Sequence, residues 1–442
     1  MKTLPFILAG LFTSTLCAVG KAPAPEGGES GGGYIAHEWG TFTSVQGAEG
    51  VQLDWNPLVV TELPKFVYDM RNPSGRPAKL VLPSVLIAGK TGTVSRQRME
   101  TPVIYFYSDK ARTVDVDVNF PDGQITEWYP QLAPLKTAVS PSSGRGVWLR
   151  SSMHWGPVDI LPGHGENEAA KFPKDETGSH YYAARETDAS AIHVKAADGT
   201  DQYEKFLFYR GVGQFEAPLL VTHWGDHAEQ IHLGNRGKEA MGPYYIYAVR
   251  GDKAALVEVG KISAGQAEDR DFKFDEIARP VAEVRAELAG KLRATLTSAG
   301  LYEKEAAAMV KTWDDSWMGE QGLRVLYALP QKWADATLPL NITPAPTELK
   351  RVFVGRAEII TPSQEWALLK ETVRYAEGGA LEKKAATAAG AQLGLGRFTD
   401  AGFRLLGTHG LRSAEFSLAV SGLVEATRPT RLKTETAAVA PQ

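Results

Sequence analysis

Histidine, tryptophan and glycine recur together at three places in this sequence. The tripeptide His-Trp-Gly stands at residues 154–156 and 223–225, and residues 37–40 read His-Glu-Trp-Gly. With 9 histidines, 10 tryptophans and 44 glycines among 442 residues, the tripeptide is expected by chance only about 0.02 times. Two occurrences and a near variant therefore indicate a common cause, which is either a shared chemistry or a shared structural corner.

The chemistry that these histidines suggest is metal binding. Three neutral imidazoles with an open fourth position form a known zinc arrangement, in which the metal activates water for hydrolysis. The candidate ligands are His37, His154, His223 and Asp226, and Glu38 is a weak candidate for the catalytic base. If the segments that carry these residues converge, the protein would be a metal-dependent hydrolase with zinc as its cofactor.

The structural interpretation of the same pattern needs no cofactor, and it is the one we favour. A strand can end with a histidine that bonds a loop, a tryptophan that caps the core and a glycine that permits a turn. If the chain contains distant β repeats, such a corner would recur in each of them. Because side chains alternate along a strand, the histidines need not share one side.

The tryptophans themselves suggest a third kind of site. Exposed aromatic rings bind sugars by stacking, so an exported β protein with several tryptophans is a candidate glycan binder. The candidate ligand-binding residues are Trp39, Trp155 and Trp224, together with the aromatic segments 127–129 and 313–317. Packing in the core is the simpler interpretation, because large aromatic side chains dominate protein cores.

Several familiar motifs are incomplete in this chain. A phosphate-binding loop would need glycine where Ser84 stands, and an HExxH zinc motif would need histidine where Thr41 stands. A calcium loop beginning at Asp115 would need glycine in place of Phe120. The net charge of -4 also gives no basic field for nucleic acid. These observations exclude a nucleotide, calcium or nucleic-acid site of the usual kinds.

The N-terminus has the composition of an export signal. Lys2 precedes an apolar stretch that is too short to span a bilayer, and small residues follow near position 20. We predict a signal peptide over 1–20 and a flexible linker over 21–33, which reads KAPAPEGGESGGG. The only cysteine, Cys17, would leave with the signal, unless it carries a lipid anchor instead. No later stretch is predicted to cross a membrane.

The next part of the chain is predicted to consist of strands. Short β-branched and aromatic runs, separated by turn residues, fill the region 34–265 and suggest one or two antiparallel β-sandwich modules, at about 34–160 and 200–265. Residues 101–107 form a compact apolar run, and 113–120 alternate between valine and polar residues. The first pattern predicts a buried strand and the second a half-buried one.

The pattern changes near residue 270. Apolar residues spaced three and four apart predict a helix within 275–299, and Thr361, Pro362 and Gln364 form a capping box that predicts a helix over 362–377. We therefore predict a mixed, mainly helical α/β region over 270–425 and a disordered tail over 426–442. The expected fold class is α+β.

Four segments together resemble a family of exported bacterial proteins of unknown activity. They are HEWGTF from His37, ETPVIYFYS from Glu100, SWMGEQGLRVLYALP from Ser316 and FVGRAEIITPSQE from Phe353. The resemblance implies secretion and a bacterial origin, but it supplies no catalytic residue.

The favoured interpretation is therefore an exported protein, periplasmic or extracellular, that acts by binding and not by catalysis. Its expected partner is a glycan or another component of the cell envelope. A zinc hydrolase is the alternative.

Overall fold

The computed structural model describes residues 33–58, 63–70, 94–140, 148–176, 178–408 and 414–427. The predicted signal peptide with Cys17, residues 21–32 of the predicted linker and residues 428–442 of the predicted tail lie outside these ranges. From Tyr34 onward the chain belongs to one structural unit.

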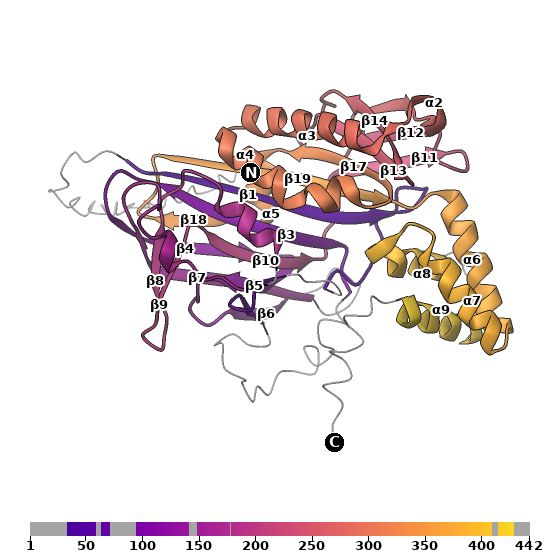
Figure 1. Ribbon diagram of the computed structural model, residues 1–442, viewed down its shortest axis with the longest axis horizontal. Coiled ribbons are helices and arrows are strands. Elements are labelled where there is room, and N and C mark those ends of the chain that lie inside the picture. Colours follow the sequence, from indigo (N-terminus) through magenta and orange to yellow (C-terminus); the bar gives the residue numbers. More distant parts are fainter. Residues whose placement is uncertain are drawn as a thin grey trace, which may run out of the picture. The chain divides into compact units, whose positions relative to one another are not determined.

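Within the described ranges, ten strands form the main sheet, and they come from distant parts of the chain (Figure 1). In spatial order they are β16 (Arg279–Pro280), β14 (Lys253–Val259), β13 (Tyr244–Arg250), β17 (Gly322–Leu329), β19 (Glu348–Ile359), β1 (Ile35–Gln46), β3 (Gln97–Tyr107), β10 (Leu207–Gly213), β5 (Gly123–Tyr129) and β2 (Tyr68–Asp69). Neighbouring strands run antiparallel except for β1 and β19, which run parallel with Ile35 opposite Glu348.

Strand β1 lies near the middle of this sheet and is covered on both faces. Every residue after Ile35 is buried, and the aromatic and β-branched residues of its sequence favour a strand in that environment. Trp39 faces one core while Phe42 faces another. Gly40 stands where β1 bulges against β3, and a Cβ at this position would lie 2.7 Å from the ring of Phe353.

Two smaller sheets pack on one face of the main sheet. We call the core that they share with this face the sheet-side core. One consists of β11 (Leu219–Trp224), β12 (Gln230–Asn235) and β15 (Ala267–Asp271). The other consists of β18 (Leu340–Thr343), β4 (Arg112–Phe120), β7 (Trp148–Ile160), β8 (Ile192–Lys195) and β9 (Asp201–Glu204), with β6 (Lys136–Ser140) also paired to β7. The predicted alternation of 113–120 is confirmed in β4, whose valines are buried.

Helices cover the opposite face of the main sheet. The longest are α3 (Val281–Ser298) and α4 (Glu303–Trp313), which lie over the strands in Figure 1 and pack with Trp39 and Tyr247 in a helix-side core. The short elements η3 (His180–Arg185) and η4 (Asp314–Gly319) also contribute to this core, whereas α2 (Phe274–Ile277) and α5 (Gln331–Thr337) pack on the sheet-side core. A further short element is η2 (Ala169–Lys171).

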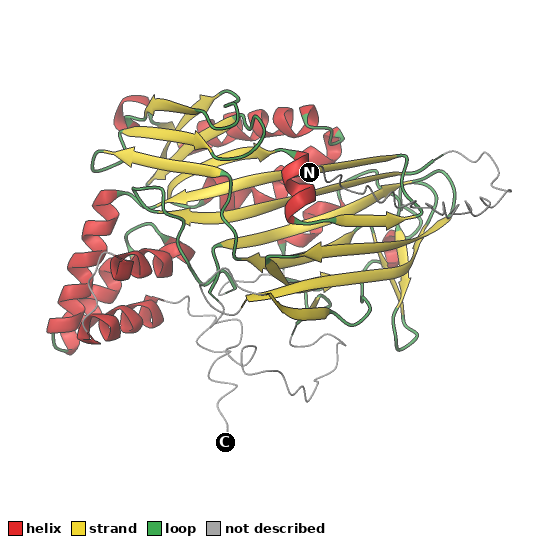
Figure 2. Ribbon diagram, turned by 180° about the vertical axis from the view of Figure 1, so that it is seen from behind, coloured by secondary structure: helices red, strands yellow, loops and turns green. Residues whose placement is uncertain are grey.

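The remaining helices gather at one end of the sheet (Figure 2). They are α6 (Pro362–Glu377), α7 (Ala380–Ala391), η5 (Gly396–Phe398), α8 (Thr399–Thr408) and α9 (Ala414–Thr427). They share a third core with Trp55 and with Val45 at the end of β1. The predicted capping box of α6 is confirmed, because Thr361 Oγ1 accepts from the Gln364 backbone and the Gln364 side chain accepts from the Thr361 backbone.

The α+β fold class is confirmed, with antiparallel-rich sheets first and helices concentrated later in the chain. The predicted division near residues 265–270, however, does not separate two sheets. Strands β17 and β19 follow that point in the sequence, yet they complete the sheet that contains β1 and β3. The change in composition near residue 270 therefore does not mark a boundary between sheets, because strands on either side of it pair with each other.

A buried ion pair joins β1 to β19. The Arg351 Nε lies 2.6 Å from the Glu38 Oε2, and both side chains are almost fully buried. The hydroxyl of Tyr209 donates to the other oxygen of Glu38. Arg351 also contacts Asp335 at 2.9 Å and donates to the carbonyl oxygen of Leu338 at 2.7 Å. The charges of Glu38 and Arg351 are thus fully engaged with each other and with these neighbours.

We predict that Arg351→Met lowers the free energy of unfolding by about 3–5 kcal/mol, because Glu38 would stay buried without its guanidinium partner. Urea denaturation measures this change. The matched control is Arg270→Met, which removes a surface arginine and should alter the free energy by less than about 0.5 kcal/mol. Equally small effects of the two substitutions would contradict a stabilising role for the pair.

Candidate functional site

The three motif histidines lie in three different sheets. His37 is on β1 of the main sheet, His154 on β7 and His223 on β11. Within the described ranges, no group of three or more histidine, cysteine, aspartate or glutamate side chains is placed to hold a metal ion. The structure therefore does not bring the predicted zinc ligands together, because the strands that carry them pair with different partners.

His37 is a buried residue of β1 that contacts the start of α4. Its Nδ1 lies 2.7 Å from the Glu305 Oε2, and the Tyr107 hydroxyl donates to the other oxygen of Glu305 at 2.8 Å. The ring of Tyr302 packs on the imidazole, with 4.6 Å between the centroids. This cluster connects the first strand of the sheet to a helix 268 residues later in the chain.

His154 and Asp226 occupy more open positions. The Nδ1 of His154 lies 2.9 Å from Asp117, its strand neighbour on β4, and its Nε2 lies 3.7 Å from Asp115. Asp226 is exposed, and its carbonyl oxygen accepts from the backbone of Ser363 at 3.0 Å. Glu38, the candidate base, is held in the buried pair with Arg351 and does not face solvent.

The candidate tryptophans divide into buried and exposed residues. Trp39 and Trp155 are fully buried, and the indole of Trp155 donates to the Pro130 carbonyl at 2.9 Å. A ring in the core cannot stack on a ligand in solution, so these two assignments need correction. Trp224 is 54% exposed and lies 6.3 Å from the ring of His232. The segments 127–129 and 313–317 likewise place Trp128, Trp313 and Trp317 in the core.

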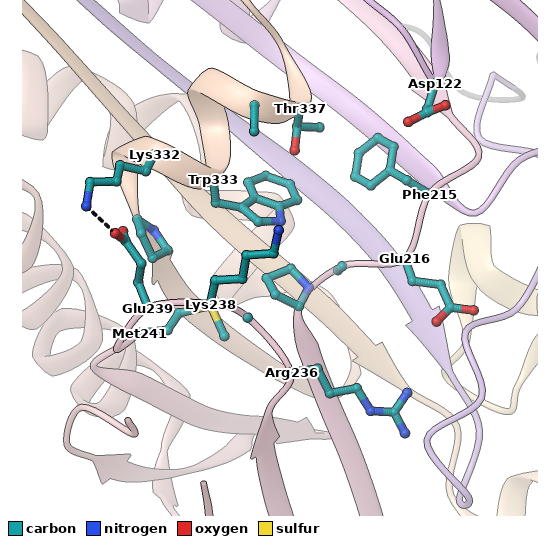
Figure 3. Close-up of a pocket in the computed structure, with 15 residues that line it drawn as sticks. Asp122, Phe215, Glu216, Arg236, Lys238, Glu239, Met241, Lys332, Trp333 and Thr337 are labelled. Atoms are coloured by element: carbon teal, nitrogen blue, oxygen red, sulfur yellow. Dashed lines mark hydrogen bonds and ion pairs between the residues drawn. The ribbon is translucent and has the colours of Figure 1, made fainter. Parts of the chain in front are cut away.

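The structure shows a different candidate site, a groove of about 640 Å³. Three chain segments and one further residue line it (Figure 3). The segments are residues 215–218 between β10 and β11, residues 236–241 after β12, and residues 330–337 at α5, and the further residue is Asp122, between β4 and β5. This volume lies within the range of about 300–1,000 Å³ that is typical of small-ligand sites.

Aromatic rings form the floor of the groove. The ring centroids of Phe215 and Trp333 are 5.8 Å apart. Both rings also contact Phe42 of β1 edge to face, at 5.6 Å for Phe215 and 5.2 Å for Trp333. Since Phe42 is buried in the central strand, it holds the two rings of the groove in a fixed position.

Charged side chains form the rim, and they differ in how they are paired. Lys332 lies 2.6 Å from Glu239, and Glu216 lies 2.7 Å from Arg96 outside the groove. Two cations, Arg236 and Lys238, have no ion-pair partner among the described residues, and in Figure 3 the side chain of Lys238 extends toward the indole of Trp333. The groove thus combines an apolar floor with free and paired charges.

This groove could not be predicted from the motifs of the sequence. Asp122 and the three segments are separated along the chain by about 20 to 90 residues, and none of them contains a repeated motif. The one available signal was Trp333, a large aromatic residue in the otherwise polar run QKWADAT. That signal is weak without knowledge of the sheet that brings the segments together.

Comparisons with known proteins do not assign the chain to a family. No family model and no curated protein matches it. Among solved structures, the zebrafish (Danio rerio) Fcho1 Mu homology domain with bound Eps15 peptide is similar over 74% of this chain and 97% of that one, with 7% identity and a TM-score of 0.29. The yeast delta-COP-I mu-homology domain complexed with the Dsl1 WxWxV peptide gives 7% identity and a TM-score of 0.26, over 74% and 98% of the two chains. Similarity at this level supports no conclusion about function.

The region of the chain that the structure describes contains no helix that is both long and apolar enough to span a membrane.

His223 is a buried histidine whose pKa is lowered by its surroundings. Only 4% of its surface is exposed, and burial lowers its pKa from the ordinary 6.5 to about 4. The backbone of Ile360 and the charge of Glu229 oppose this shift only in part. The imidazole is therefore neutral at pH 7, as expected of a ring that packs in a core.

This shift predicts a loss of stability in acid. The unfolded chain takes up the proton of His223 near pH 6.5 and the folded chain only near pH 4, so acidification through this window favours unfolding by as much as about 3 kcal/mol. The free energy of unfolding, measured at pH 7 and pH 4.5, should fall less for His223→Gln than for the unmodified protein. The variant His232→Gln, at a half-buried histidine, is the control, and an identical acid response in all three proteins would refute the assignment.

Proposed function

We propose that this protein is a non-enzymatic binding protein that is exported from the cytoplasm and holds a glycan of the cell envelope in the Trp333 groove. The observation that carries the proposal is the pair of aromatic rings, Phe215 and Trp333, at the floor of a groove with a charged rim. Sugar rings present apolar C–H faces to aromatic rings and hydroxyl groups to polar side chains.

The fixed position of the floor supports binding. Phe42 contacts both rings, so little side-chain freedom remains to be lost when a ligand stacks on them. The rim supplies hydrogen-bond donors from Arg236 and Lys238 and acceptors from Asp122. A ligand that carries both hydroxyl and acidic groups, such as an acidic oligosaccharide, complements this combination.

The lining residues favour binding over catalysis. Those that the structure describes include no histidine, serine or cysteine that could serve as a nucleophile or as an imidazole base. Two of the three carboxylates, Glu216 and Glu239, are engaged with Arg96 and Lys332. A pair of carboxylates that hydrolyses a glycosidic bond needs one acid that is free to donate its proton.

We predict that Trp333→Ala weakens glycan binding about tenfold, which corresponds to about 1.4 kcal/mol, because the stacking surface is lost. Soluble peptidoglycan fragments and neutral and acidic oligosaccharides would be screened with the unmodified protein, and titration calorimetry would then compare the variants on whichever sugar binds.

Trp224→Ala provides the matched control, because Trp224 is exposed but lies outside the groove. It should leave the affinity unchanged. Absence of binding to the whole panel, or a loss that follows Trp224 and spares Trp333, would reject the groove as a glycan site.

Export is tested separately by the mass of the mature protein. The protein recovered from the periplasm or the medium should begin at Lys21 and contain no cysteine, because cleavage after residue 20 removes Cys17. A mature protein that begins with a lipid-modified Cys17 would support the anchored alternative. Full-length protein confined to the cytoplasm would contradict export.

A further inference from the structure

Five buried or nearly buried arginines lie on the helix-side face of the main sheet and at its contact with η5. They are Arg98, Arg210, Arg324, Arg356 and Arg397. Four of them have a glutamate close by: Arg324 and Arg356 lie within 3.2 Å of Glu358, and Arg98 and Arg397 lie within 3.0 Å of Glu100. Buried charges are normally matched in this way, because an unmatched one is costly to desolvate.

Arg210 is the exception. Only 9% of its surface is exposed, yet it has no carboxylate within ion-pair distance among the described residues. Its hydrogen bonds to these residues both go to the Oγ1 of Thr101, from Nε at 3.3 Å and from Nη2 at 3.1 Å. A guanidinium has five N–H donors, so most of the donors of Arg210 have no hydrogen-bond partner among the residues that the structure describes.

The residue that binds Arg210 has an uncommon backbone conformation. Thr101 has a φ of 49°, in the left-handed region that β-branched residues rarely adopt. The pairing of β3 with β1 and with β10 is irregular at this point. Strain of this kind persists only where the surrounding structure enforces it, and it is concentrated at functional sites. The strained residue is Thr101, and its hydroxyl oxygen accepts the hydrogen bonds of the Arg210 guanidinium.

The local charge balance is positive. Glu100 accepts from Thr43 at 2.9 Å and from Arg397 at 2.6 Å, and it pairs with Arg98. Burial acts to raise the pKa of Glu100, but Arg397 and Arg98 outweigh that effect and hold it at about 2, so this carboxylate is ionised and already shared. Burial, and then the charge of Arg98, lower the pKa of Arg210 to about 10. The charge of Glu127, which stands opposite Arg210 on β5, raises the pKa of Arg210, but not enough to cancel the lowering.

We propose that Arg210 is the anchor of a second ligand site, which binds an oxyanion: a phosphate, sulfate or carboxylate group. The planar fork of Arg210 would bind two oxygens of such a group, as arginine does at many phosphate and carboxylate sites. Arg98 and Arg397 add a positive field at the same place. The site is separate from the groove, because Arg210 lies over the ring of Phe208 in the helix-side core, whereas the groove rings pack against the sheet-side core.

Direct binding is tested with inorganic phosphate, sulfate and acetate as probes. Calorimetry and thermal unfolding of the full chain should show saturable binding, with the divalent anions stronger than acetate. Arg210→Lys, which keeps the charge but loses the fork, should weaken binding at least tenfold, and the surface control Arg270→Lys should leave it unchanged. No saturable effect of any of the three anions on the unmodified protein would overturn the proposal.

The stability of the anion-free protein separates a binding arginine from a structural one. Arg210→Met removes a charge that has no carboxylate within ion-pair distance among the described residues, so it should leave the unfolding midpoint unchanged or raise it, and it should abolish stabilisation by phosphate. Arg324→Met removes one partner of a buried pair and should lower the midpoint. If Arg210→Met lowers the midpoint as much as Arg324→Met does, Arg210 is structural and the proposal fails.

Discussion

The constraint on which the rest of the structure depends is the parallel pairing of β1 with β19. Strand β1 begins two residues after the predicted linker, and its partner lies more than 300 residues later in the chain. Parallel strands require a long crossover connection, and here the connection contains most of the protein. The main sheet is therefore complete only when both Ile35–Gln46 and Glu348–Ile359 are in place, and the buried contact of Glu38 with Arg351 favours this register over its neighbours.

The central position of β1 also explains why so many contacts of the protein pass through its twelve residues. On one face, His37 binds Glu305 at the start of α4. On the same face, Thr43 donates to Glu100, which lies among Arg98, Arg210 and Arg397 in what we call the arginine cluster. On the other face, Phe42 supports both aromatic rings of the groove. Because alternate side chains of a strand point to opposite faces, one short segment positions the helix contact, the groove and the arginine cluster.

Much of the local structure could be predicted from the sequence. The strand over 113–120 and the cap at Thr361 depend on residues that are neighbours in the chain, and the structure has both. Membership of the sheets could not be predicted, because a pattern of alternation shows that a strand exists but does not identify its partner. The division near 265–270 therefore missed β17 and β19 as members of the first sheet.

The candidate sites illustrate the same limit. The recurrence of histidine and tryptophan is a real feature of the sequence, but its members occupy unlike places: Trp39 and Trp155 are buried, and Trp224 is exposed. A shared motif predicted a shared environment, and the tertiary structure does not supply one. The groove was missed for the opposite reason, since Phe215, Lys238 and Trp333 share no motif and meet only through the sheet.

The arginine cluster shows how attachment of the C-terminal helices and charge balance are connected. Arg397, on η5, reaches Glu100 on β3, and its guanidinium lies over the rings of Phe398 and Trp55. Glu100 is thereby committed to holding the helical region on the sheet, and its oxygens also serve Thr43 and Arg98. A carboxylate shared in this way cannot also neutralise Arg210. Among the described residues, the interaction that attaches the helices thus leaves Arg210 without an ion-pair partner, which is the premise of the proposed oxyanion site.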